Sequence, residues 1–292
     1  MKIQSALISI AVLFSLTLPS AAPAMEGDEA DFGRISDLTG TLQVKGGYDP
    51  DWMSMGVNVP VGEGDSLWLE HGGLAEVEFP GGTRVRMQGE SKLDLLELTV
   101  FPGAFSLNLE ALEGRFYIRT PDQAGGEGIA PVDVKVPSAR ISIRPESLVR
   151  LDIESGRTRV RVQEGSVRID PFGPGGPTPV FLGRMEQIQL STEGDPGYPG
   201  YFTTASDDGL ERYNRFRDNR FMEQDRPEPL DEPLVGQDEL ARNGSWVFIG
   251  GVSYWRPYVS VGWRPYSVGH WAWHTGFGWT WISGDPFGYV TF

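Results

Sequence analysis

The chain of 292 residues contains 38 Gly and 22 Pro, no Cys and only three His, and its formal net charge is −15. The lack of cysteine excludes disulfides, thiolate metal sites and a cysteine nucleophile. The acidic balance argues against a general nucleic-acid-binding protein, which would carry a basic surface. Hydrophobic residues make up 39% of the chain, so the composition is typical of a turn-rich, mainly β protein with a core.

The first 24 residues have the pattern of a secretory signal peptide. Lys2 precedes an apolar run from Leu7 to Leu18, and Ala22-Pro23-Ala24 forms a small-residue exit. The run is shorter than the about 20 residues that a membrane-spanning helix needs, and no other segment is long and apolar enough. We expect cleavage after Ala24, a periplasmic or secreted location and no transmembrane span afterwards; the alternative is a short uncleaved anchor.

Residues 32–191 are expected to form a β-rich domain. Apolar and polar residues alternate with a period of two, which places apolar side chains on one face of each strand. Turn signals separate the strands, and no long helical pattern interrupts them, so an antiparallel β-sandwich or solenoid-like fold is favoured over a parallel sheet with crossover helices. The clearest alternating runs are 41–45, 74–79, 83–87, 140–144 and 158–162.

Several motifs in this domain, taken in order, resemble the FecR domain family. Val61–Leu67 places paired glycines before an acidic residue and a strand, Gly73–Met87 places two strands around a Pro-Gly-Gly turn, and Leu112–Ile118 is a strand containing glycine. Val136–Ile141 departs from the family in Ser138 and in its spacing. The resemblance implies an envelope location and a domain built for protein contact. Its glycines are interpreted as turn residues with positive φ or close packing, not as ligand-binding positions: Gly62, Gly64, Gly82, Gly114 and Gly165.

FecR proteins relay the state of an outer-membrane receptor to a sigma factor. That relay needs a cytoplasmic segment and a membrane span, and neither is recognisable in this sequence. We therefore do not expect sigma-factor regulation by this chain itself.

Residues 192–243 are expected to be a linker with one helix near 208–222. Asp207 or Asp208 can cap its start. The prolines between Arg226 and Gly236 indicate an extended segment. The helix is interpreted as an amphipathic connector that docks on a neighbouring part of the protein through apolar residues near helical spacing, namely Leu210, Tyr213, Phe216 and Phe221.

Residues 244–292 hold seven of the nine tryptophans, four of them spaced by eight residues, with glycines at the breaks. This period predicts a small module of Trp-rich β-hairpin repeats. Core packing of the rings is the favoured interpretation, because so short a segment has little volume for a core and large aromatic rings fill that volume efficiently. An exposed stacking surface for glycan or peptide is the alternative. The side chains of that surface would be Trp255, Tyr258, Trp263, Tyr266, Trp271, Trp273, Trp279 and Trp281.

Gly269–Trp273 and Gly278–Ser283 resemble an uncharacterised tryptophan-rich domain found after FecR domains in secreted Gram-negative proteins. That family usually continues with further aromatic repeats, whereas this sequence stops at Phe292; a truncated domain and a sequence fragment are both open alternatives. His270 and His274 lie four residues apart without a third ligand, and no metal site is expected.

No catalytic set is evident. There is no Gly-x-Ser-x-Gly element, His71 adjoins a glycine turn, and no pair of carboxylates stands out among 40 acidic residues. We expect a non-enzymatic binding or signalling-type envelope protein, without cofactor, whose FecR-like domain contacts another envelope protein. Glycan binding through the aromatic tail is the alternative, and a degenerate relay that senses an outer-membrane receptor is a third hypothesis.

Overall fold

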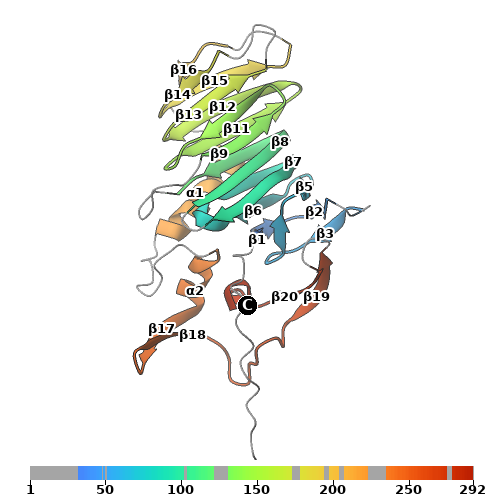
Figure 1. Ribbon diagram of the computed structural model, residues 1–292, viewed down its shortest axis with the longest axis vertical. Helices are drawn as coiled ribbons and strands as arrows, with labels where there is room; N and C mark the ends of the chain where they lie inside the picture. Colours follow the sequence, from blue (N-terminus) through green and yellow to red (C-terminus); the bar gives the residue numbers. More distant parts are fainter. Residues whose placement is uncertain are drawn as a thin grey trace, which may run out of the picture. The chain divides into compact units, whose positions relative to one another are not determined.

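The computed structural model (Figure 1) describes residues 32–47, 49, 51–101, 104–121, 131–172, 178–193, 197–203, 207–222, 235–274 and 278–291. The predicted signal peptide and the proline-rich segment 226–234 lie outside the described residues. Within the described residues most of the regular structure is β-strand, which confirms the mainly β prediction.

A long hairpin organises the β domain. Strands β7 (Arg84–Phe101) and β8 (Ala104–Arg119) pair antiparallel along their lengths, with register shifts between Gln88 and Lys92. Gly114 lies opposite this irregularity with φ +106°, and a Cβ added there would overlap the side chain of Ser91. Each long strand therefore divides into two segments on either side of a bulge, and each segment pairs with different neighbours.

The segments 84–88 and 114–119 form the centre of the first arm of the sheet. All neighbours in this arm are antiparallel. Besides β7 and β8, its strands are β1 (Phe32–Thr39), β4 (Pro60–Gly62), β6 (Leu74–Glu78), β11 (Leu148–Glu154), β12 (Arg157–Glu164), β15 (Glu186–Ser191) and β16 (Gly200–Tyr201).

The opposite ends of β7 and β8 form the centre of the second arm. Strand β9 pairs parallel with β8, and the other neighbours are antiparallel. In Figure 1 β9 and β11 lie on one side of the long hairpin, and β5 and β6 lie on the other. The added strands of the second arm are β2 (Leu42–Lys45), β3 (Met53–Met55), β5 (Ser66–Leu69), β9 (Val132–Val136), β10 (Ala139–Ile143), β13 (Val167–Pro171) and β14 (Val180–Leu182).

One hydrophobic core receives side chains from both arms. Val149 and Val160 come from the first arm, and Ile141 and Ile169 come from the second, and all four are fully buried. The alternating runs of the sequence explain this arrangement, since each strand gives every second residue to the core. The five predicted runs all fall on strands, although an end residue of four of them lies just outside the strand, and the sandwich interpretation describes the domain. Gly62 differs from the other four selected glycines, because it lies in β4 without positive φ.

Two helices follow the strands in the chain, where one was expected. Helix α1 (Gly209–Met222) matches the predicted linker helix, and α2 (Gln237–Asn243) was missed. Among the described residues, no helix has the length and apolar composition needed to cross a membrane. Short 3-10 turns lie at Pro80–Gly82 (η1) and Gly288–Thr291 (η2).

The C-terminal residues form two hairpins. Strands β17 (Gly244–Ile249) and β18 (Val252–Pro257) are joined by Gly250 and Gly251, both with positive φ, which is the signature of a tight two-residue turn. Strands β19 (Gly269–His274) and β20 (Gly278–Ser283) form the second hairpin.

The predicted hairpin repeat does not continue between these hairpins, because residues 258–268 lie in turns and irregular segments. Pro265 cannot donate to a ladder, and Gly262 and Tyr266 have positive φ, so the second Trp-Arg-Pro-Tyr copy does not repeat the strand of the first.

Candidate functional site: a polar face covered by a helix

Helix α1 lies on the polar face of the first arm. In β7 and β8 the core takes Val85, Met87, Phe116 and Ile118, so the residues between them face away from the core. The helix begins as predicted, because the Asp208 carboxylate accepts a hydrogen bond from the backbone N–H of Glu211 (2.9 Å). Glutamate and aspartate near this end also suit the positive end of the helix dipole.

The side chains beneath α1 form a row that crosses five strands. Cross-strand register places these residues opposite one another on neighbouring strands. The row is therefore fixed by strand pairing, although its members lie far apart in the sequence. In order across β1, β6, β7, β8 and β11 it contains Asp37, Glu76, Arg86, Tyr117 and Arg150.

The helix contacts this row strand by strand, starting from β11. Asp208 accepts two hydrogen bonds from Arg150 (2.5 and 3.0 Å). Three residues further on, Glu211 accepts one from the hydroxyl of Tyr117 on β8. A step of three residues advances a helix by about 4.5 Å, close to the about 4.8 Å between neighbouring strands. The match lets successive helical positions meet successive strands.

The same order continues over β7 and β6. Arg86 donates to Asn214 and, at 2.7 Å, to Asp218. Arg217 donates to Glu76 on β6 at 2.5 Å. The charge order of the helix therefore complements the charge order of the row, with carboxylates over arginines and an arginine over a glutamate.

Further contacts extend the interface. Asp218 also pairs with Arg119 of β8 at 2.7 Å. Tyr213 donates to Asp37 of β1 at 2.8 Å.

The charges at the centre of this interface are buried. Glu76, Arg86 and Arg217 are each at most 2% exposed. Burial alone would raise the pKa of Glu76, but the charges of Arg86 and Arg217 outweigh it and hold the pKa well below its usual range. Glu76 is therefore ionised at neutral pH and bonded on both sides.

Apolar contact between α1 and the sheet is small. Leu210 and Tyr213 pack with Tyr117 and Leu148 in a cluster separate from the main core. Phe216, expected on the docking face, is 57% exposed. Polar residues of α1, such as Asn214 and Arg217, form the contact face instead. The sequence prediction identified a docking helix but missed its ionic character.

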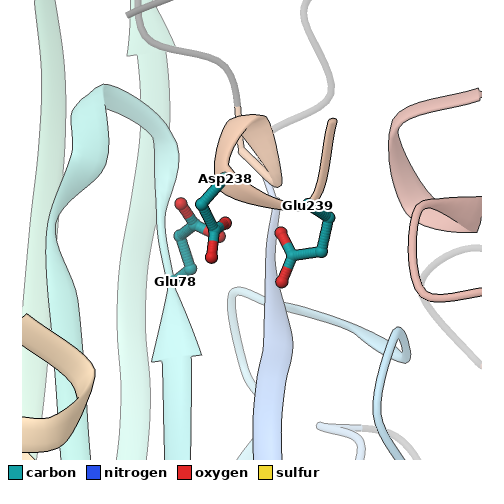
Figure 2. A group of neighbouring side chains, drawn as sticks. All are labelled: Glu78, Asp238 and Glu239. Carbon is teal, nitrogen blue, oxygen red and sulfur yellow. The ribbon is translucent and has the colours of Figure 1, made fainter. Parts of the chain in front are cut away.

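A second polar contact holds α2 against the β domain (Figure 2). Arg34 of β1 is buried and reaches three carboxylates, at 3.0 Å from Glu78, 2.5 Å from Glu239 and 3.7 Å from Asp238. Figure 2 shows the side chains of these three acidic residues. The three carboxylate groups could ligate a metal by type and spacing. The guanidinium group already contacts all three of them, which explains the cluster as the anchor of α2.

Further contacts extend from Arg34 to the chain's last residues. Arg34 donates to Asn58 (3.1 Å), and Asn58 donates to the carbonyl oxygen of Ser283 (3.1 Å). The Tyr289 ring lies 5.2 Å from the Arg34 guanidinium carbon, a cation–π contact. Arg34 thus ties β1, α2 and the C-terminal hairpin region together.

Glu239 differs electrostatically from the other two carboxylates. Burial raises the pKa of Glu239 well above its ordinary value, and a hydrogen bond with Asp238 adds to the rise, against the opposing charge of Arg34. Glu239 therefore holds a proton at a higher pH than an ordinary glutamate does. The proton removes one negative charge from a crowded buried cluster.

The predicted aromatic site divides into two groups, and the first faces outward. In the β19–β20 hairpin Trp271 pairs with Trp281 and Trp273 with Trp279, all on one face. Ile282, on the opposite face, is buried in the main core. Trp271, Trp273 and Trp279 are 61%, 51% and 66% exposed. The favoured core interpretation therefore does not describe these three rings.

The outward rings contact one another edge to face. Centroids are 5.6 Å apart for Trp271 and Trp281, and 5.7 Å apart for Trp273 and Trp279, at interplanar angles of 67° and 74°. Such cross-strand pairs stabilise the hairpin itself. Tyr266 lies beside Trp281 at 6.3 Å.

The second aromatic group faces inward. Trp255 and Trp263 pack on the buried ring of Phe287 at 5.1 and 5.9 Å. The indole N–H of Trp255 donates to the Leu240 carbonyl (3.0 Å), and that of Trp263 to Asp285 (3.2 Å). Core packing describes these two rings, whereas Tyr258 remains exposed.

Comparisons with known proteins confirm both sequence resemblances. Residues 65–168 match the family described as FecR protein, and residues 237–292 match DUF6600, a family of unknown function. No curated protein shows significant similarity to the chain. Helix α1 lies between the two matched ranges, whereas Arg86, Tyr117 and Arg150 lie within the first.

Solved structures add a distant likeness. Two crystal structures, at 1.65 and 2.50 Å resolution, of a candidate anti-sigma factor from Parabacteroides distasonis share 17% identity with the chain at a TM-score of 0.36. The similarity covers 52% of this chain and 64% and 63% of those chains, less than two thirds of their length.

The FecR match supports a signalling-type regulatory protein. The chain combines a FecR domain over residues 65–168 with a DUF6600 domain over residues 237–292.

Proposed function

We propose that the chain is a non-enzymatic regulatory protein of the Gram-negative envelope, which acts by binding another envelope protein through its FecR domain. One observation carries this proposal. The polar face of that domain holds a helix through side-chain pairs that follow the strands one by one, from Arg150 to Glu76. A sheet face whose charges are held in fixed positions provides orientation and specificity for a protein partner.

The envelope location rests on the N-terminal pattern and on the family resemblance. Fractionation of cells that produce the full chain tests it. We expect the protein in the periplasmic or external fraction with a new N-terminus at Met25. Retention in the cytoplasm with Met1 intact would contradict the location.

Protein binding is tested by crosslinking the full chain in intact cells. We expect one or a few specific envelope proteins in the crosslinked product. An Arg150→Glu variant serves as a matched control, because it reverses one charge of the polar row. Equal recovery with the variant, or no partner in either case, would contradict binding through this face.

A second candidate function is glycan binding, favoured by the outward rings of Trp271, Trp273 and Trp279. Exposed aromatic faces stack on sugar rings as they do on other flat apolar surfaces. Titration of the protein with peptidoglycan and soluble polysaccharide, followed by tryptophan fluorescence, tests this function. Fluorescence that does not change, or that changes equally after replacing the three residues with Ala, would contradict it.

A further inference from the structure

The interface beneath α1 is built from charges and hydrogen bonds. On β11, β8, β7 and β6 its sheet side chains form hydrogen bonds with α1 or with the residue that caps it. Polar interfaces between two parts of one chain resemble transient protein–protein interfaces. The contact therefore has the character of a recognition surface.

The main core does not depend on α1. Among the described residues, the buried members of that core come from the β strands and the segments between them, and α1 supplies Leu210 and Tyr213 only to the separate small cluster. Removal of α1 would uncover Glu76, Arg86 and Arg150, which water solvates readily, and little apolar surface. The FecR domain could open here while its core stays packed.

We infer that this polar row is the partner-binding surface of the FecR domain, that α1 is a built-in competitor covering it, and that the partner presents an acidic helix. The inference rests on the proposed function and names its surface. The partner helix would carry carboxylates placed as those of Asp208, Glu211 and Asp218, so that they meet Arg150, Tyr117 and Arg86. Charge complementarity selects this occupant, because the row has arginines on β7 and β11 and a hydroxyl donor on β8 between them.

Competition by a tethered helix is strong. A segment on a short tether is present at an effective concentration in the millimolar range. A free helix with the same contacts therefore binds weakly while α1 is in place. Weakening α1 on the helix side, with every sheet residue kept, should make the row available.

The test uses the full chain and a fluorescein-labelled peptide of residues 207–222. The variant Asp208→Asn with Asp218→Asn removes two carboxylates from α1 and leaves Arg86, Arg119 and Arg150 in place. Binding is measured by fluorescence anisotropy. We expect the variant to bind the peptide at least about tenfold more tightly than the wild-type chain, a change of about 1.4 kcal/mol.

The control is a peptide of the same length in which Asp208, Glu211 and Asp218 are replaced by Lys. We expect no binding of this peptide to either protein. The inference is overturned if a variant with wild-type far-UV circular dichroism binds the native peptide no better than the wild-type chain does. Equal binding of both peptides would also overturn it.

Hydrogen exchange of the wild-type chain keeps the inference falsifiable if the double variant does not fold. We expect the amides of α1 to exchange at least about 100-fold faster than those of β7 and β8, through local opening. Equal protection would mean that α1 leaves only when the domain unfolds, and would overturn the inference. If the peptide binds as expected and cells yield no crosslinked partner, the proposed function fails, whereas the inference that the row binds a helix stands.

Discussion

Arg86 and Asp218 lie 132 residues apart in the sequence, yet their side chains meet at 2.7 Å beneath helix α1. Arg86 belongs to the central hairpin of the FecR domain and Asp218 to a helix outside both matched family ranges. Glu76 holds the other side of Arg86 at 2.7 Å. The helix is thus attached to the domain by a buried charge network, whose energetics can be examined by removing single charges.

Replacement of Glu76 by Gln should strongly destabilise the protein. The carboxylate is fully buried and bonded to Arg86 and Arg217, so its loss leaves two buried arginines without their common partner. We expect a loss of about 3–5 kcal/mol in the free energy of unfolding, the usual result of breaking a buried ion pair. Urea unfolding, followed by circular dichroism, measures it.

Glu154→Gln is the matched control for that measurement. Glu154 lies exposed at the end of β11. We expect its unfolding free energy to stay within about 0.5 kcal/mol of wild type. Similar results for the two variants would mean that the buried network does not stabilise the fold.

The attachment of α1 should weaken in acid through Asp208. Burial alone would raise its pKa, but hydrogen bonds from Arg150 and from the Glu211 backbone outweigh burial and lower the pKa to about 2. The unfolded value is about 3.9. The stabilisation is therefore complete above about pH 4 and is lost as the pH falls towards 2. Because the Asp208 side chain is 29% exposed and its charge is partly screened by solvent, we expect a stabilisation of only about 0.5–1 kcal/mol.

Asp208→Asn separates this charge effect from helix capping, since Asn also caps helices well. Thermal unfolding between about pH 5 and 2 should show a smaller acid dependence in the variant than in the wild type. Asp207→Asn, at an exposed neighbouring position, should keep the wild-type profile. The same acid dependence in all three proteins would exclude Asp208 as the cause.

The sequence predicted where α1 begins and that it docks, because a cap and a helical spacing are local signals. It could not predict the docking partners. Asp37, Glu76 and Arg150 come together only through strand register, which the alternation of apolar residues does not determine. Phe216 was misplaced for the same reason, since hydrophobicity alone suggested the contact face and an ionic face decided it.

The contact that anchors α2 should contribute less to stability as the pH rises and Glu239 loses its proton. Its folded pKa is raised above the unfolded value, so folding must take up a proton at neutral pH. The free energy of unfolding therefore falls with rising pH above the unfolded pKa. Glu239→Gln mimics the protonated acid, with an amide N–H for Asp238 and a carbonyl oxygen for Arg34. We expect the variant to lose less stability than wild type between about pH 5 and 9.

Urea unfolding midpoints across this pH range measure the difference. Glu113→Gln, at an exposed position on β8, should keep the wild-type slope. A Glu239→Gln slope as steep as that of the wild type would mean that Glu239 is ionised in the folded protein.

The tryptophan repeat shows a second limit of sequence reasoning. Trp at i and i+2 correctly predicted a common face, but alternation does not tell which face of a hairpin meets the rest of the protein. Ile282, a single apolar residue between Trp281 and Ser283, takes the core position and turns the larger rings outward. The repeated Trp-Arg-Pro-Tyr motif also led to a wrong expectation of repeated strands. The first copy begins in β18, whereas the second copy lies outside any strand.

Quenching by acrylamide should distinguish the outward rings from the inward ones. Replacement of Trp271, Trp273 and Trp279 by Phe should remove most of the quenchable fluorescence. Trp263→Phe is the control, because that ring is half-buried on Phe287 and its N–H is bonded to Asp285. We expect the control to retain wild-type quenching and to lose about 1 kcal/mol with its hydrogen bond. If quenching falls in the control and stays at the wild-type level in the triple variant, Trp263 is the exposed ring and the other three rings are buried.

The bulge that divides the two arms of the sheet should be sensitive to Gly114. Its φ of +106° is unfavourable for residues with a Cβ, and the added atom would overlap Ser91 on the facing strand. We expect Gly114→Ala to lower the free energy of unfolding by about 2–4 kcal/mol, from backbone strain together with overpacking. Gly56→Ala, where nothing lies within 4 Å of the added Cβ, should change stability by less than about 1 kcal/mol. If both variants unfold at the wild-type urea concentration, close contact at Gly114 does not fix the position of the bulge, and the register shifts of β7 and β8 must be set by the neighbouring strands.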